Sequence, residues 1–313
     1  MSDGGPTIVQ SNPKYGGGFN PSALPPGAEA YLAPDNPALV SLQQRYAAFD
    51  RKVTAPLVWQ PDYIDAAELR HFRGDNGYVW QLRGRNMSRP GYALATYYAL
   101  ARDRLGLLDR LSEDDAFGNF TFEIAGKLVS RDLLDSVNEL AFLDRHLGLN
   151  GAAPLTVLDI GAGYGRLAHR AVTAFDNLRW LCTDAVPVST FVSDYYLRFR
   201  GVAERAASIP LDQIEQRLAQ TPADLAINIH SFPECRLEAI RWWLGVIAAR
   251  GVRRLFLVPN EPHGLLVTND GADMTPLIAQ AGYRLVVREP KYADPFVQES
   301  AIIPTHYYLF ELS

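Results

Sequence analysis

Residues 157–166 read Val-Leu-Asp-Ile-Gly-Ala-Gly-Tyr-Gly-Arg, and they join an apolar run to a stretch with helical periodicity. Glycines in such a turn let backbone amides approach a ligand closely and adopt torsion angles that are closed to other residues. Tight strand-to-helix turns also need glycine, so the turn alone does not identify a ligand. The third glycine is Gly165, and Arg166 stands where a dinucleotide fingerprint needs its last glycine. The turn therefore departs from the dinucleotide pattern.

The next apolar run ends in a second acidic residue, Asp184. A carboxylate at that position can accept hydrogen bonds from both hydroxyls of a ribose. An aspartate that caps the helix expected from Pro187 would give the same pattern. Combined with the glycine spacing, Asp184 favours S-adenosylmethionine (SAM) over NAD as the ligand of this turn.

SAM carries an ammonium, a carboxylate and a sulfonium, but no phosphate. We expect Asp159 to compensate the ammonium while amides of the glycine turn donate to the carboxylate. The adenine is expected after a weak third strand, near Ser208 and Ile209, by position only. The expected cofactor contacts are Asp159, Gly161, Gly163, Gly165, Asp184, Ser208, Ile209 and His230.

Short apolar runs alternate with helical periodicity from residue 155 onward. The pattern predicts strands at 155–160, 178–183, 202–206, 223–230, 253–258, 283–288 and 306–312, and helices at 165–175, 187–200, 233–250 and 273–281. This alternation is typical of an α/β fold with an open, mostly parallel sheet that helices cover on both faces. Ligands of such sheets bind outside the carboxyl ends of the strands, where the glycine turn and Asp184 lie.

The chain divides into three parts by composition. Residues 1–35 are rich in Gly, Pro, Ser and Asn, and we expect a flexible arm. Residues 36–150 are expected to be mainly helical, with helices opening at Pro37, after Pro90 and after Ser130. Residues 151–313 then form the SAM-binding domain.

Composition limits the classes of partner. Lys and Arg total 30 against 35 Asp and Glu, so the positive field that would attract nucleic acid is missing. The chain has two cysteines, no apolar stretch near the ~18 residues that cross a bilayer, and no secretory signal pattern. We therefore expect a soluble cytoplasmic protein without a membrane or nucleic-acid partner, and a homo-oligomer is compatible with the sequence. Asp184, Asp270 and Asp273 lack metal-ligand spacing, and we expect no obligatory metal.

Four blocks of sequence resemble the sugar O-methyltransferases, a group of class I methyltransferases of bacterial antibiotic-glycoside and surface-polysaccharide pathways. The blocks are residues 126–130, 157–165, 228–234 (Asn-Ile-His-Ser-Phe-Pro-Glu) and 255–261 (Leu-Phe-Leu-Val-Pro-Asn-Glu). The resemblance implies a sheet in the order 3-2-1-4-5-7-6 with an antiparallel last strand, SAM as cofactor, and methyl transfer to a sugar hydroxyl of a glycosylated small molecule. Residues 1–90 match no family that we can name.

Methyl transfer to a hydroxyl usually needs a base at the carboxyl edge of the sheet. His230 and His263 both follow predicted strands, and a neutral histidine has a pKa near working pH. We predict His263 as the base and His230 as a cofactor-side residue. The alternative for His263 is a solvated position on its loop, and the alternative for His230 is a wall of the cofactor pocket that moves no proton. Glu234 either holds the acceptor or stabilises the first turn of its helix. The aromatic and polar stretch 78–86 is suited to sugar contact or to packing.

Four functions remain compatible with the sequence. The first is methylation of a sugar hydroxyl, and the second is N- or O-methylation of an aglycone. The third is an NAD-dependent oxidoreductase, against which Arg166 counts. The fourth is a protein that binds the cofactor without catalysis.

Overall fold

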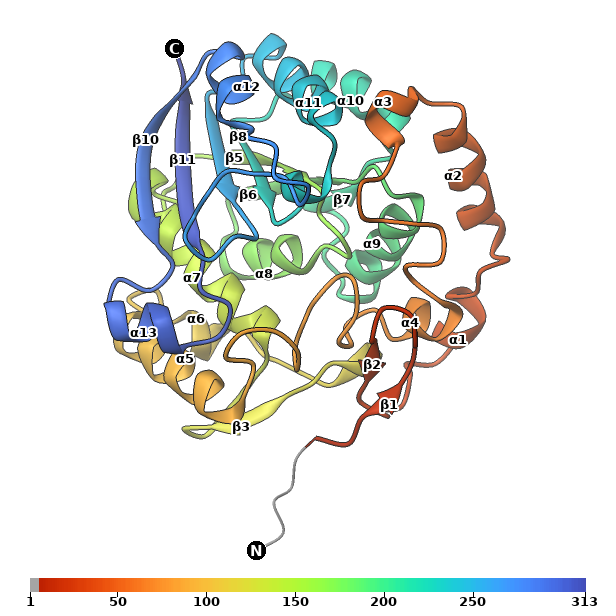
Figure 1. The fold of residues 1–313 in the computed structure, drawn as a ribbon, viewed down its shortest axis with the longest axis vertical. Coiled ribbons are helices and arrows are strands. Elements are labelled where there is room, and N and C mark those ends of the chain that lie inside the picture. Colours follow the sequence, from red (N-terminus) through yellow and green to blue (C-terminus); the bar gives the residue numbers. More distant parts are fainter. Residues whose placement is uncertain (1–5) are drawn as a thin grey trace, which may run out of the picture.

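The computed structural model describes residues 6–313. A twisted sheet lies at its centre with helices on both faces, and the N-terminal half of the chain packs along one side of it (Figure 1). The seven strands of the sheet, in spatial order, are β7 (Ala206–Ser208), β6 (Leu178–Thr183), β5 (Leu155–Ile160), β8 (Leu225–Ile229), β9 (Arg254–Val258), β11 (His306–Leu312) and β10 (Tyr283–Pro290). Counted along the chain within this sheet, that order is 3-2-1-4-5-7-6. β11 runs antiparallel to both neighbours, and the other pairs are parallel. The expected α/β fold with a mostly parallel sheet is confirmed.

The core lies on the two faces of this sheet, because successive residues of a strand point to opposite sides. Val157 and Trp180 belong to the hydrophobic cluster on one face, whereas Leu158 and Leu181 belong to the cluster on the other. The first cluster includes side chains of α7 (Arg131–Leu147) and α8 (Arg166–Ala174). The second includes side chains of α9 (Pro187–Phe199), α10 (Ile214–Gln220), α11 (Leu237–Ala249) and α12 (Thr275–Gln280).

Three elements of residues 151–313 differ from the expectation. The third strand begins at Ala206, because Val202 accepts turn hydrogen bonds from the amides of Arg205 and Ala206. α10 and α13 (Pro295–Ser300) were not expected. Both are short, with seven and six residues, so they show too few turns for a clear helical period.

The N-terminal half is less helical than expected. Its helices are α1 (Ala28–Tyr31), α2 (Pro37–Ala47), α3 (Arg51–Thr54), α4 (Ala66–Arg70), α5 (Arg89–Arg102) and α6 (Leu107–Arg110). Two small hairpins accompany them, β1 (Val9–Gln10) with β2 (Gly18–Phe19) and β3 (Phe122–Ile124) with β4 (Lys127–Val129). Irregular chain at 55–65 and 71–88 separates the helices, since Pro and Gly recur there. One 3-10 turn, η1 (Ala116–Gly118), lies in this half, whereas η2 (Leu211–Gln213) and η3 (Phe232–Glu234) lie among the strands and helices of the sheet domain.

The expectation of a flexible arm is wrong for residues 6–35, whereas residues 1–5 lie outside the described part of the chain. Ala28 and Leu32 are fully buried. Gly18 exchanges backbone hydrogen bonds with Asp75, and Asn20 donates its amide to Gly118. The segment therefore gains order from partners far along the chain, which its own composition does not reveal.

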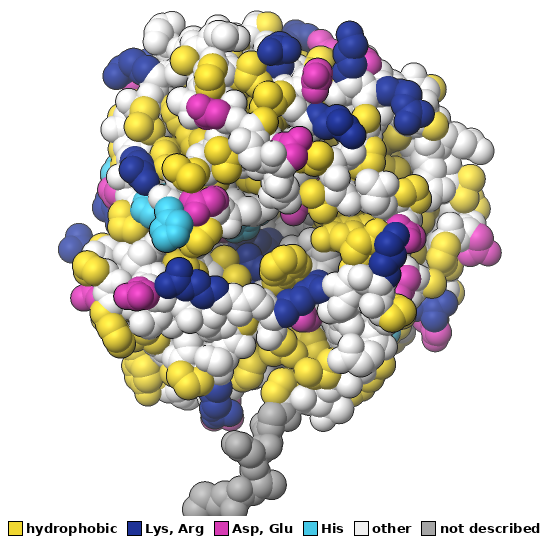
Figure 2. All heavy atoms as spheres, in the orientation of Figure 1, with side chains coloured by type: hydrophobic (Ala, Val, Ile, Leu, Met, Phe, Trp, Pro, Cys, Tyr) yellow, Lys and Arg dark blue, Asp and Glu magenta, His cyan; other side chains and the backbone are white. Residues whose placement is uncertain are grey.

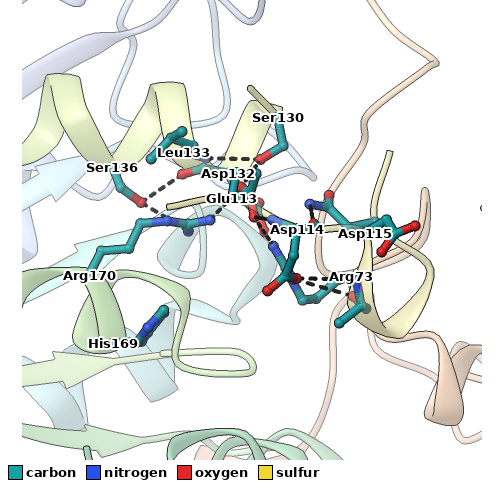
Figure 3. Close-up of polar contacts among 12 residues, drawn as sticks. Arg73, Glu113, Asp114, Asp115, Ser130, Asp132, Leu133, Ser136, His169 and Arg170 are labelled. Atoms are coloured by element: carbon teal, nitrogen blue, oxygen red, sulfur yellow. Dashed lines mark hydrogen bonds and ion pairs between the residues drawn. The ribbon is translucent and has the colours of Figure 1, made fainter. Parts of the chain in front are cut away.

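A cluster of charged side chains, in which Arg73, Glu113 and Arg170 are buried, joins the N-terminal half to the sheet helices (Figure 3). Glu113 lies between two arginines: one oxygen accepts from Arg73, and the other accepts from Arg170 on α8 at 2.8 Å. Asp114 accepts from Arg73 at 2.5 Å and from Arg200 at 2.6 Å. Such a cluster fixes relative positions because removing one partner leaves a buried charge uncompensated.

Across residues 6–313, no helix combines the length and the apolar character needed to span a bilayer. Within the same residues, no three His, Cys, Asp or Glu side chains gather in a way that could hold a metal ion. Cys182 and Cys235 are both free.

Candidate functional site

The glycine turn connects β5 to α8 and meets the loops that follow β6 and β8. Gly161 and Gly163 have φ angles of 75° and 57°. A Cβ on Gly161 would lie 2.0 Å from the Ser231 hydroxyl oxygen, so no larger residue fits there. The Gly163 amide donates to a carboxylate oxygen of Asp184 over 3.2 Å. Three loops at the carboxyl edge of the sheet are thus held together at one point.

The two acidic residues named from the sequence both lie at this edge. Asp159 accepts a hydrogen bond from the indole Nε1 of Trp180 at 3.0 Å, and Asp184 accepts one from the amide of Val186 at 2.8 Å. Burial raises the pKa of Asp159 to about 7 and that of Asp184 to about 7, because desolvation disfavours the charged form. Each carboxyl therefore gains most from a ligand that brings a positive charge or a hydrogen-bond donor.

A cavity of about 510 Å³ opens between the carboxyl edge of the sheet and the N-terminal half. Figure 2 shows the face on which these halves meet, hollowed near its centre with hydrophobic side chains at the rim. The loops after β6 and β8 contribute Asp184, His230 and Glu234 to the lining, and irregular segments of the N-terminal half contribute Trp59 and Tyr78. Most of the remaining lining side chains are apolar. The volume and this mixture suit an organic ligand with a few polar groups.

A second cavity of about 80 Å³ lies on the other side of the glycine turn and is lined by charged side chains. Arg131 pairs with Asp135 at 3.0 Å. Arg166 pairs with Glu139, with both nitrogen–oxygen distances at 2.8 Å. Asp132 is different, because its two carboxylate oxygens are buried and have no hydrogen-bond partner among residues 6–313. The cavity thus presents paired arginines and a carboxylate without hydrogen-bond partners, so it can offer both signs of charge to a zwitterionic group.

The two cavities share five lining residues: Tyr78, Gly161, Gly163, Ile229 and His230. They are therefore adjacent spaces on either side of one constriction at the glycine turn. A single elongated ligand can place a charged end in the small cavity and a larger end in the large one.

His230 is brought to this constriction with a strained backbone at φ 65°. Its ring Nδ1 lies 3.2 Å from the carbonyl oxygen of Pro259. Burial lowers the pKa of His230 to about 3, so the ring is neutral and Nδ1 donates its proton to that carbonyl. The other ring nitrogen, Nε2, is left as a hydrogen-bond acceptor.

Glu234 lines the large cavity from η3, just beyond β8. One of its oxygens accepts a hydrogen bond from the indole Nε1 of Trp59 at 2.7 Å. Burial raises the pKa of Glu234 to about 7, so near neutral pH the carboxyl exchanges its proton readily. Glu234 was predicted from the sequence as a site residue, but Trp59 was not. Trp59 lies in an irregular segment, where no periodicity or motif indicates its contact with Glu234.

Four of the expected site residues are not brought to either cavity. His263 is exposed on the loop after β9, where its carbonyl accepts from Arg288, so strand order alone misplaced it. The hydroxyl of Ser208 donates to the carbonyl of Thr190, and Ile209 is buried, with the amide of Leu211 two residues later donating to the Tyr46 hydroxyl of α2. Gly165 sits at the start of α8 with Ser193 beside it and faces neither space.

The stretch 78–86 is only partly at the site. Tyr78 and Val79 line the cavities, whereas Trp80 is exposed and its ring lies under the Arg83 guanidinium at 5.1 Å. Asn86 donates to the carbonyl of Glu299 and is part of the contact with α13. The stretch is thus mainly an interface between segments, and Tyr78 is the residue of it that faces both cavities.

No family model matches the chain, and no curated protein matches it. Solved structures with a similar fold include the mitomycin 7-O-methyltransferase, at 21% identity and a TM-score of 0.39, with 57% of each chain covered. The magnesium protoporphyrin IX methyltransferase of Synechocystis PCC 6803 with bound SAM is 15% identical, with a TM-score of 0.42 over 72% of this chain and 100% of that one. Geranyl diphosphate methyltransferase in complex with SAM is 13% identical, with a TM-score of 0.39 over 57% of this chain and 86% of that one. The chain spans little more than half of the first of these proteins, and the likeness concerns the fold alone.

Proposed function

We propose that this chain is a SAM-dependent methyltransferase that acts on a hydroxyl group of a small molecule. The observation that carries the proposal is the constriction at Gly161 and Gly163, with a charged cavity on one side and a large, mostly apolar cavity on the other. SAM has the matching shape, since a zwitterionic amino acid and an adenosine are joined at one sulfur atom.

The residues of both cavities fit the chemical groups of SAM. Asp159 and Asp132 offer carboxylates to the ammonium, and Arg131 lies on the same small cavity to attract the carboxylate. Asp184 lines the large cavity and can accept hydrogen bonds from the ribose hydroxyls. Its raised pKa supports this assignment, because hydroxyl donors would stabilise the ionised form that burial disfavours.

Glu234 is the best candidate for the base. When bound, SAM supplies an electrophilic methyl group on a positively charged sulfur. Glu234 lies in the same cavity as Asp184, and Trp59 holds one of its oxygens, so the carboxylate is positioned to accept the proton of an acceptor hydroxyl. A carboxyl whose pKa lies near 7 is suited to that proton transfer at neutral pH. The apolar lining limits water near the reacting atoms.

Two classes of acceptor compete for the large cavity. The resemblance of residues 228–234 and 255–261 to sugar O-methyltransferases favours a sugar hydroxyl of a glycosylated small molecule. The lining favours an aglycone hydroxyl, because Trp59, Ile64, Leu69 and Trp243 offer more apolar than hydrogen-bonding surface. We propose that the methylated ring is a hydrophobic one and retain the sugar as the second candidate.

An NAD-dependent oxidoreductase fits less well. Arg166 stands at the start of α8, where a dinucleotide fingerprint needs its last glycine for close packing of helix and strand, and it is bonded to Glu139 through both guanidinium NH groups. The ion pair with Glu139 holds the Arg166 side chain in place, so the side chain does not move aside to make room for a dinucleotide.

Mass spectrometry of acceptor panels tests the proposal. Phenolic aglycones and their glycosides are incubated with the protein and SAM, with and without Glu234→Gln. We expect a gain of one methyl group on a phenolic hydroxyl, at a rate that falls strongly in the variant. Methylation confined to the sugar would select the second candidate, and no methylation of any hydroxyl compound would contradict the proposal.

A further inference from the structure

The constriction between the two cavities is covered by an aromatic side chain, Tyr78. Its ring comes close to the glycine turn: a Cβ built on Gly163 would lie 3.4 Å from the ring atom Cδ1. Tyr78 belongs to the irregular segment at 71–88, so this ring is brought to the sheet by the N-terminal half. Tyr78 therefore does not belong to residues 151–313, which contain the glycine turn.

Several contacts hold the Tyr78 ring in place. Ser189 on α9 donates to its hydroxyl at 3.3 Å. The ring centroid lies 5.1 Å from that of Trp59 and 6.1 Å from that of Tyr164, the second pair edge to face. The amide of Tyr78 donates to the side chain of Asn76 at 2.9 Å. Burial raises the pKa of the phenol well above its ordinary value, so the ring stays neutral.

If SAM binds as proposed above, its sulfur must lie at the constriction. The sulfur joins the amino-acid end, which suits the small charged cavity, to the ribose end, which suits Asp184 in the large one. The five residues that line both cavities therefore flank the sulfonium. Two are glycines and one is Ile229; of the remaining two, Tyr78 has the larger π face, and His230 already uses one nitrogen on Pro259.

We propose that Tyr78 is a binding residue for the sulfonium: its ring face attracts the positive sulfur and so favours SAM over the neutral product S-adenosylhomocysteine (SAH). A cation over the face of a desolvated tyrosine is stabilised electrostatically by the ring quadrupole. SAH has the same amino acid, ribose and adenine, but it lacks the methyl group and the charge. The change in this preference when Tyr78 alone is replaced therefore reports the ring's contribution, and the preference itself promotes product release.

The test is the ratio of dissociation constants for SAM and SAH, measured by isothermal titration calorimetry. For Tyr78→Leu we expect the ratio Kd(SAM)/Kd(SAH) to rise by about 5- to 30-fold over wild type, the range for a desolvated cation–π contact. Tyr78→Phe keeps the ring, and it should keep the ratio. Tyr63→Leu is the matched control, because Tyr63 packs on Trp59 at 4.9 Å yet lines neither cavity.

A shape-preserving variant guards against loss of folding in Tyr78→Leu. Pentafluorophenylalanine at position 78 keeps the ring's size but removes its negative face, and we expect the same direction of change in the ratio. An unchanged ratio in this variant, or equal losses for SAM and SAH in Tyr78→Leu, would overturn the inference and leave Tyr78 a packing residue. Wild-type protein that binds neither ligand would instead contradict the proposed function on which the inference rests.

Discussion

The indole Nε1 of Trp59 donates a hydrogen bond to Glu234 over 2.7 Å, which joins the N-terminal half to the residues that follow β8. Trp59 lies in irregular chain between α3 and α4, and Glu234 lies in η3. The large cavity lies where these two segments meet. The large cavity therefore depends on both halves of the chain, and the proposed base is held by a residue 175 positions away.

Glu234 should control the pH dependence of turnover. Its pKa is raised to about 7, and the ionised form is the one that accepts a proton, so activity should increase as the pH rises through about 7. Glu234→Gln should lower kcat by about 10²- to 10⁴-fold and remove that limb of the profile. Steady-state kinetics between pH 5.5 and 9 make the comparison. A full pH limb in the glutamine variant would assign the titration to another group.

His263 should be dispensable for turnover. It is exposed and lines neither cavity, so His263→Ala should keep kcat within about 2-fold of wild type. His230→Ala is the matched comparison, because His230 lies at the constriction and its loss should weaken cofactor binding. A large fall of kcat in His263→Ala would mean that its loop closes over the acceptor during the reaction.

Asp184→Ala should weaken SAM binding by about 1 to 3 kcal/mol, the range for losing a hydrogen bond to a charged group. The carboxylate also accepts from the amides of Gly163 and Val186, so part of the loss reflects a less ordered turn. Asp184→Asn keeps one acceptor oxygen and should lose less. Calorimetric titration with SAM measures both variants, and unchanged affinity in Asp184→Ala would leave Asp184 only a structural role.

The segment that precedes α2 should contribute to stability. Leu32 is fully buried against the second hydrophobic cluster, so Leu32→Ala should lower the free energy of unfolding by about 2 to 5 kcal/mol. Val40→Ala, at an exposed position on α2, should change it little. Urea denaturation followed by tryptophan fluorescence compares the two. A negligible effect of Leu32→Ala would instead agree with the prediction, made from composition, that residues 1–35 form a flexible arm.

The sheet and the glycine turn were predictable because each is encoded locally. Apolar runs of strand length appear in order from Leu155, and Gly161, Gly163 and Asp184 belong to contiguous segments at the carboxyl ends of two neighbouring strands. The resemblance to a family supplied the strand order as an expectation, which periodicity alone does not give.

The surroundings of the two cavities were predicted poorly because they depend on contacts between distant segments. Trp59 and Tyr78 come from irregular chain that has no period, and no local signal shows that they reach the sheet. Ser208 and Ile209 were expected to contact adenine, but the Tyr46 hydroxyl of α2 bonds Thr190 and the amide of Leu211 beside them. Asp132 was missed because an acidic residue in the first turn of a helix looks like one that stabilises the helix end.

Calorimetric titration of the protein with SAM, SAH and NAD in parallel shows whether the glycine turn binds an adenosyl ligand or a dinucleotide. We expect one site per chain for SAM and for SAH, no binding of NAD, and weaker binding of both adenosyl ligands to Asp184→Ala. Saturable binding of NAD together with no heat for SAM or SAH would contradict the account and assign the glycine turn to a dinucleotide.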